Sequence, residues 1–338
     1  MTVLAAFTRG LDRVGRAPWL VAGLWASTLI VALPLTILLS ERLSQDLGSS
    51  MAADSAAQGV NLDWWNEFLA RSEGLPRSFV PSIIGFAAVL KNLSGVVDAE
   101  APLLPVLLAS AAHGGLALFL MGGVLDRLAR GRPGGGRAFF AACGMFFFRF
   151  LRLALISGVV YALLFLWLHP WLFGTVYSAW TRNVTVERTA FWYRVVLYLA
   201  FGALVLVVNL VVDYAKVRAV VEDRRSALGA LLAGARFVRR HPGAAVGLYL
   251  LDAGLFLLLI AAYSLVAREP EGGAAAWMAV AVGQIYIVLR VVLRLQFAAS
   301  QVVLFQGRLA HAGYLAVPLP EWPDSPDAPI IRPEQMRP

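Results

Sequence analysis

Six apolar stretches, each about as long as a bilayer is thick, constrain this chain more than any other feature. The hydrocarbon core measures about 30 Å and an α-helix rises about 1.5 Å per residue, so a span needs about 20 apolar residues. Only 15% of the residues are charged, against about 25% in a soluble domain. The sequence therefore predicts an all-α polytopic membrane helical bundle, with short interfacial amphipathic helices besides its six transmembrane helices. The predicted spans are residues 18–39, 102–124, 153–175, 192–215, 244–266 and 275–299.

The spans form one predicted membrane domain over residues 1–315, followed by a Pro-rich tail over 316–338. A tail of this composition is typical of an extended segment, and we expect it in the cytoplasm. The first apolar stretch follows three arginines, as in a signal peptide. It is too long for the apolar core of a signal peptide and lacks a small-residue cleavage site, so we expect an uncleaved span.

Basic residues alternate between the connecting segments. The N-terminal segment has three, the 125–152 loop six and the 214–243 loop seven. The 41–101 segment has four basic residues against eight acidic ones, and the remaining loops have two and one. The positive-inside rule then places both termini in the cytoplasm. The loops also account for the net charge of +8, so no nucleic-acid partner is predicted.

The long outer segment 41–101 contains two short apolar elements. Residues 62–71 have helical spacing, and we expect Trp64 and Trp65 at the membrane interface. Residues 79–90 are apolar but too short to span, which indicates a re-entrant or interfacial element. The segment is a lid, a partner-docking surface, or a cap that shields the ends of the spans. On the cytoplasmic side, residues 138–148 and 226–238 are predicted to form amphipathic surface helices.

Polar residues within the spans are the candidate functional site. By helix rise, Asp252 and Arg290 lie at similar depth in consecutive spans and are expected to pair. Arg294 lies one turn from Arg290, and Asn209 and Asp213 share a face of the fourth span. The five residues are predicted to form an intramembrane polar cluster. It either lines a route for an anion, a proton or a lipid headgroup, or consists of neutralised pairs that fix helix register.

Signals for other chemistry are missing. The sequence has no Walker-type phosphate loop and no nucleophile elbow, and its four histidines are not at metal-ligand spacing. Cys143 is the only cysteine, so no intramolecular disulfide is expected. We predict no catalytic residue, no metal site and no cofactor.

Residues 211–218, 220–223 and 237–242 (VVDYAKVR, VVED and FVRRHP) carry a family resemblance. The pattern resembles uncharacterised bacterial six-helix membrane proteins, namely the YciC-like group and the membrane domain appended to some glycerophosphodiester phosphodiesterases. The resemblance implies a bacterial inner-membrane location and a helical bundle. It supplies no catalytic residue, because the soluble phosphodiesterase domain has no counterpart here.

Two functions follow as hypotheses. The first is a non-enzymatic scaffold or subunit of a membrane complex, with a protein partner or a second copy of the chain. The alternative is a small transporter or lipid-handling protein that uses the intramembrane polar cluster. A membrane-embedded enzyme is disfavoured, because no catalytic constellation is visible. An open cavity at Asp252 and Arg290 would favour the alternative, and a dry, closed cluster would favour the scaffold.

Overall fold

The computed structural model describes residues 1–48, 50–58, 61–79, 85–100, 103–131, 135–267 and 273–308. Every regular element in these ranges is helical. Six helical stretches are long and apolar enough to cross a membrane, which confirms the predicted fold class. They are Pro18–Leu47 (α2), Leu104–Arg130 (α6), Gly136–Thr181 (α7, Gly136–Ala162, with its helical continuation), Glu187–Val221 (α9), Pro242–Val266 (α11) and Ala274–Arg308 within α12 (Gly273–Arg308).

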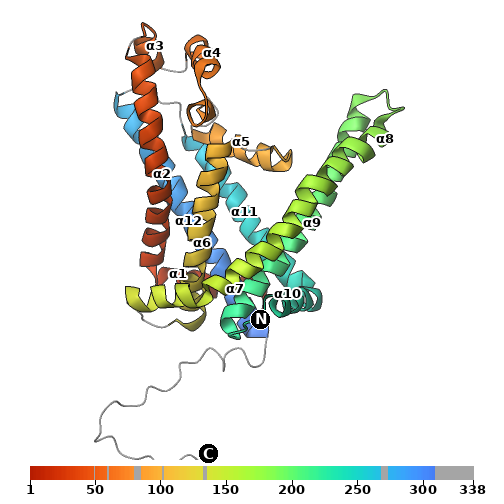
Figure 1. The fold of residues 1–338 in the computed structure, drawn as a ribbon. Helices are drawn as coiled ribbons and strands as arrows, with labels where there is room; N and C mark the ends of the chain where they lie inside the picture. Colours follow the sequence, from red (N-terminus) through yellow and green to blue (C-terminus); the bar gives the residue numbers. More distant parts are fainter. Residues whose placement is uncertain are drawn as a thin grey trace, which may run out of the picture.

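Short helices lie at the two ends of the bundle. At one end are α1 (Val3–Gly15) and α10 (Ala227–Arg240), both amphipathic. At the other are α3 (Ala53–Gln58), α4 (Leu62–Arg71) and α8 (Tyr177–Thr181) (Figure 1). The segments predicted on one side of the membrane therefore gather at the same end of the molecule. We call the end with α1 and α10 the base.

Local sequence signals set several helix ends. The Thr2 hydroxyl accepts a hydrogen bond from the Ala5 amide and so caps α1. The Ser226 hydroxyl caps α10 in the same way through Gly229. Helix α6 ends at Gly131, whose φ of +63° is a left-handed conformation that glycine adopts without strain. Pro242 opens α11, because its missing amide proton is not needed in the first turn.

The predicted surface helix 138–148 is not a separate element. It forms the first turns of α7, which lie across the base before the later turns rise beside α9 (Figure 1). Nothing between 138 and 162 breaks a helix, since the isolated Gly144 and Gly158 are tolerated. Beyond Ala162, two π-helical segments (η3, Leu163–Leu168, and η4, Trp171–Val176) flank Pro170, which cannot donate a helix hydrogen bond.

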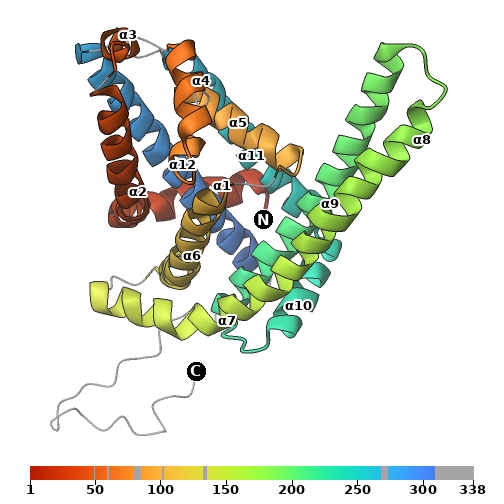
Figure 2. The ribbon, with the colours of Figure 1, turned by 45° about the horizontal axis from the view of Figure 1, so that its top comes forward.

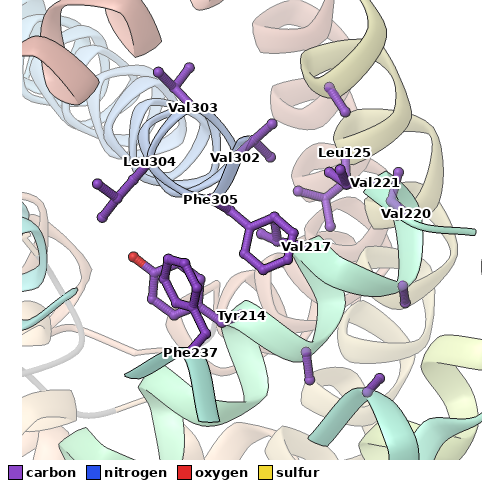
Figure 3. Close-up of a cluster of buried hydrophobic side chains, with 14 of the residues drawn as sticks. Leu125, Tyr214, Val217, Val220, Val221, Phe237, Val302, Val303, Leu304 and Phe305 are labelled. Atoms are coloured by element: carbon purple, nitrogen blue, oxygen red, sulfur yellow. The ribbon is translucent and has the colours of Figure 1, made fainter. Parts of the chain in front are cut away.

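The main hydrophobic core lies at the base (Figure 3). Tyr214 and Val217 of α9, Phe237 of α10 and Phe305 of α12 are buried there, with Leu125 of α6. The rings of Phe237 and Phe305 lie 5.1 Å apart. From this base α9 and its partner α7 lean away from α12, α2 and α6 (Figures 1 and 2).

Candidate functional site

Helix α9 carries a polar face at the predicted spacing, and Asn209 joins three helices there. Its side-chain oxygen accepts a hydrogen bond from the hydroxyl of Tyr161 on α7. Its amide nitrogen donates to the hydroxyl of Tyr249 on α11, at 3.4 Å. Asn209 is thus satisfied by neighbouring tyrosines, not by the charged residues of the predicted cluster.

One turn closer to the base, Asp213 is neutralised within its own helix. The Lys216 ammonium lies 3.0 Å from one Asp213 oxygen. The side-chain nitrogen of Gln301 on α12 donates to the other oxygen at 3.4 Å. Asp213 therefore has a cation and a cross-helix donor, and it ties α9 to α12.

Arg290 and Arg294 form a second, different environment on α12. Together with Phe297 and Gln301 they cover an arc of about 60° of the helix circumference, because residues spaced by four, seven and eleven align on a helix. Gln301 contacts Asp213, and the Phe297 ring lies 5.2 Å from the Tyr249 ring of α11. This face is therefore turned toward α9 and α11.

Both arginines are exposed, and neither has a hydrogen bond or an ion pair within the described ranges. Arg294 also borders a small pocket of about 50 Å³ between α2, α6 and α12. His113 of α6 and the hydroxyl-bearing Ser27 and Thr28 of α2 line the same pocket. Two unpaired guanidinium groups thus lie one turn apart between α6, α9 and α12.

The predicted pairing of Asp252 with Arg290 is wrong. Helices α11 and α12 do pack against each other, as their short connection suggested. Both Asp252 carboxylate oxygens are nevertheless buried and have no hydrogen-bond partner in the described part of the chain. Asp252 lies within electrostatic range of the Tyr214 phenol, whose buried hydroxyl is also unpartnered. Arg290 is exposed whereas the Asp252 carboxylate oxygens are buried, so the two groups lie in different environments.

The α9 face that carries Asn209 and Asp213 continues to Gly202. Gly202 is exposed, and a Cβ added there would meet no atom within 4 Å. Gly202 and Arg290 each lie eleven residues, about 16 Å, above the contact between Asp213 and Gln301. Above that contact α9 and α12 lean apart (Figures 1 and 2), and Gly202 and Arg290 are exposed on these two helices. We call this region the α9–α12 opening.

Helix α5 (Gly85–Val97) crosses the far end of this opening (Figure 2). At its C-terminal end, the Tyr198 hydroxyl of α9 donates a 2.7 Å hydrogen bond to Asp98. The His169 ring lies 3.0 Å from the Val97 carbonyl oxygen. At its other end, the Phe86 ring packs 6.4 Å from the Tyr263 ring of α11. Helix α5 therefore bridges the α7–α9 pair and α11. Of the predicted short element 79–90, residues 80–84 lie outside the described residues.

Trp64 and Trp65, the residues predicted at the membrane interface, pack within the protein. Both are buried, at 6% and 5% exposure, and pack with Phe68 against Leu43 and Leu47 of α2. The Trp64 indole nitrogen donates to Asp46 at 3.0 Å. Their rings contact protein and hold α4 against the C-terminal end of α2.

Three contributors to the polar network were missed at the sequence level, namely Tyr161, Tyr249 and Gln301. A signal existed for two of them, since Gln301 continues the Arg290–Arg294 face and Tyr249 lies one turn before Asp252. Within the described residues, no group of three or more His, Cys, Asp or Glu side chains is arranged to hold a metal ion.

The sequence matches no protein-family model, and comparison with curated proteins and with solved structures finds no significant similarity.

Proposed function

We propose that this multi-pass membrane protein binds an anionic amphiphile, with the anionic group at Arg290 and Arg294 in the α9–α12 opening. The observation that carries the proposal is the pair of exposed arginines on the inward face of α12, which make no hydrogen bond or ion pair with the residues that the structure describes. A lone charge at the centre of a bilayer costs about 2.5–3.5 kcal/mol on insertion scales. An anionic ligand between the two side chains offsets that cost.

A lipid-like ligand fits the surroundings better than a small hydrophilic one. Guanidinium groups bind phosphate and carboxylate through paired hydrogen bonds, so two arginines one turn apart suit a headgroup. The α9 face that carries Gly202 is apolar on either side of it, where Val205 and Leu206 are half-buried. An acyl chain matches such a wall. This favours lipid handling, the alternative among the sequence hypotheses, over a closed structural cluster.

The cellular setting belongs to the same proposal. We place the protein in a bacterial cytoplasmic membrane with the base and both chain termini in the cytoplasm. The positive-inside pattern supports the orientation, because α1 and α10 with their arginines lie together at the base. The bacterial inner membrane rests on the resemblance to six-helix bacterial membrane proteins.

The test is lipid retention. The protein is reconstituted in nanodiscs of mixed phosphatidylglycerol and phosphatidylcholine, extracted gently and weighed by native mass spectrometry. Arg290→Gln with Arg294→Gln is expected to lower retained phosphatidylglycerol by about tenfold, the effect of losing two charged contacts. Gly202→Leu is expected to act likewise by filling the opening.

The matched control is Arg182→Gln with Arg188→Gln, which removes the same charge from exposed positions at the other end of the molecule. Equal loss of phosphatidylglycerol in the control and test variants would overturn the proposal, as would unchanged retention in folded Arg290/Arg294 variants.

A subunit or scaffold role is the second proposal. The observation that favours it is the far half of the α7–α9 pair, which leans away from the other spans (Figure 1). Its residues Trp167, Trp171 and Trp180 are exposed, and the flat indoles suit a partner helix. Native mass spectrometry of the protein from its own membrane distinguishes the two roles, since a stoichiometric second polypeptide supports the subunit.

A further inference from the structure

A second basic site lies at the base, away from the α9–α12 opening. It is a pocket of about 200 Å³ where the C-terminal ends of α9 and α12 meet α10. Four arginines contribute to its lining, with one glutamate and one histidine among the remaining residues. The arginines are Arg218, Arg236, Arg240 and Arg308. We call this cavity the base pocket.

Not all of these charges are free. Glu222 forms an ion pair with Arg218, with 2.8 Å between the Arg218 Nε and a carboxylate oxygen. It forms a second ion pair, at 3.3 Å, with Arg224, which lies outside the pocket. Arg218 also donates to the Gly229 carbonyl oxygen at 3.3 Å. Glu222 and Arg218 therefore neutralise each other and hold the end of α9 against α10. They form a fixed wall of the pocket.

The other three arginines keep their charge available. Arg236, Arg240 and Arg308 are exposed and make no ion pair in the described ranges. Arg308 is oriented by a 2.8 Å hydrogen bond to the Met1 carbonyl oxygen. Arg236 and Arg240 lie one turn apart on α10, where like charges repel. An anion between them relieves that repulsion.

The floor of the pocket is apolar and rigid. The buried Phe237 and Phe305 rings, 5.1 Å apart, belong to the main core, and Figure 3 shows them at the meeting point of α9, α10 and α12. The arginines on this floor are therefore anchored to well-packed helices, which lowers the entropic cost of organising them around a ligand. Basic pockets between membrane helices on the cytoplasmic side suit phosphate-bearing headgroups.

We infer that the base pocket binds a phosphate group, held by Arg236, Arg240 and Arg308 above the Phe237–Phe305 floor. A guanidinium group donates paired hydrogen bonds to two phosphate oxygens. Three such groups offer more donors than the two oxygens of one carboxylate can accept, which favours a phosphate. The phosphate belongs to a phospholipid of the adjacent leaflet or to a soluble phosphate compound. The inference is independent of the proposed function, since the base pocket shares no residue with the α9–α12 opening.

The experiment uses the full chain in phosphatidylcholine nanodiscs. One arm adds phosphatidic acid to the nanodiscs and counts bound molecules by native mass spectrometry, with every protein in an Arg290→Gln, Arg294→Gln background so that the α9–α12 opening does not contribute. The other titrates inorganic pyrophosphate by isothermal calorimetry. Variant-dependent binding in the first arm alone identifies a lipid phosphate, and binding in the second identifies a soluble one.

The test variant is Arg236→Gln with Arg240→Gln, and the control is Arg225→Gln with Arg239→Gln. Both remove two exposed charges from the base, but Arg225 and Arg239 do not line the pocket. The test variant is expected to weaken phosphate binding by about tenfold or more, and the control by less than about twofold. Binding lost equally in both variants, or no binding in either arm by the unaltered protein, would overturn the inference. The Arg290/Arg294 variants are expected to leave binding at the base pocket intact.

Discussion

Gln301 of α12 donates a hydrogen bond to Asp213 of α9, at 3.4 Å, and this contact marks a division in the molecule. Below it, α9, α10 and α12 share the main core. Above it, α9 and α12 lean apart (Figures 1 and 2). The exposed Arg294 and Arg290 lie seven and eleven residues above Gln301 on α12, in the part of the molecule where α9 and α12 diverge.

Asp213 and Asp252 are expected to respond in opposite ways to neutralisation. Asp213→Asn removes the partner of Lys216 and is expected to destabilise the protein by about 1–3 kcal/mol. Asp252→Asn relieves a buried carboxylate without partners and is expected to leave stability unchanged or raise it by about 1 kcal/mol. Thermal unfolding in detergent measures both. A large loss of stability in Asp252→Asn would mean that Asp252 has a partner after all.

The contact between Asp98 and Tyr198 is expected to depend on pH. The hydrogen bond from the Tyr198 hydroxyl, above all, holds the pKa of Asp98 below its usual value. A lowered folded-state pKa stabilises the contact above the ordinary aspartate pKa of about 3.9, and this stabilisation is lost as pH falls through the lowered value. Helix α5 is therefore expected to stay attached to α9 at neutral pH and to loosen in acid below about pH 4.

The distance between α5 and α9 is measured by electron–electron double resonance. The spin labels are attached at Leu90→Cys and Val196→Cys, both exposed positions, in a Cys143→Ser background. Tyr198→Phe is expected to broaden the distance distribution already at pH 7, because the carboxylate loses its donor. Tyr193→Phe is the control, since Tyr193 packs its ring on Trp180 and makes no hydrogen bond through its hydroxyl in the described ranges. Identical distributions in Tyr198→Phe and the unaltered protein would contradict the role of this contact.

Gly234 sets how closely α10 approaches α9. A Cβ at Gly234 would lie 2.6 Å from the Val211 carbonyl oxygen and 3.0 Å from the Ala215 nitrogen. Backbone atoms cannot yield as a flexible side chain does, so Gly234→Ala is expected to cost about 1–3 kcal/mol of stability. Gly144→Ala, where an added Cβ meets nothing within 4 Å, is expected to be neutral or stabilising in the same unfolding assay. Equal changes in stability for Gly234→Ala and Gly144→Ala would show that the close approach of α10 to α9 does not contribute to stability.

Arg13 joins three helices at the base. Its guanidinium donates to the Leu128 carbonyl oxygen at 2.7 Å and to the Gln306 side-chain oxygen at 3.0 Å. Arg13→Lys loses the fork geometry and is expected to destabilise the protein by about 1–2 kcal/mol. Arg16→Lys is the control, because within the described residues Arg16 makes only an exposed pair with Asp12, and its effect is expected to stay within about 0.5 kcal/mol. If Arg13→Lys left the stability unchanged, the two hydrogen bonds of Arg13 would not be what holds these helices together.

The fold class was predictable because each span is a local property. Apolar length fixes where helices cross a bilayer, and Pro242, Ser226 and Gly131 mark helix ends by backbone chemistry that needs no neighbour. The same periodicity correctly put Asn209 and Asp213 on one face of α9. The predicted break between residues 148 and 153 is wrong, because residues 149–152 include none that stops a helix.

The candidate site was only half predictable. Equal depth suggested that Asp252 and Arg290 meet, but depth leaves the rotation of each helix about its axis undetermined. Packing decided that rotation, since it buries Asp252 near Tyr214 and leaves Arg290 exposed. Likewise, the amphipathic pattern of 62–71 could not distinguish a bilayer surface from the side of α2, because both are apolar.

The sequence by itself determined the six apolar helices and the faces on which their polar residues lie, because apolar length and helical periodicity are properties of consecutive residues. Only the tertiary structure decided which of those faces meet. The lean of α9 away from α12, the unpaired arginines above Gln301 and the base pocket all depend on contacts between residues far apart in sequence, and such contacts are set by packing.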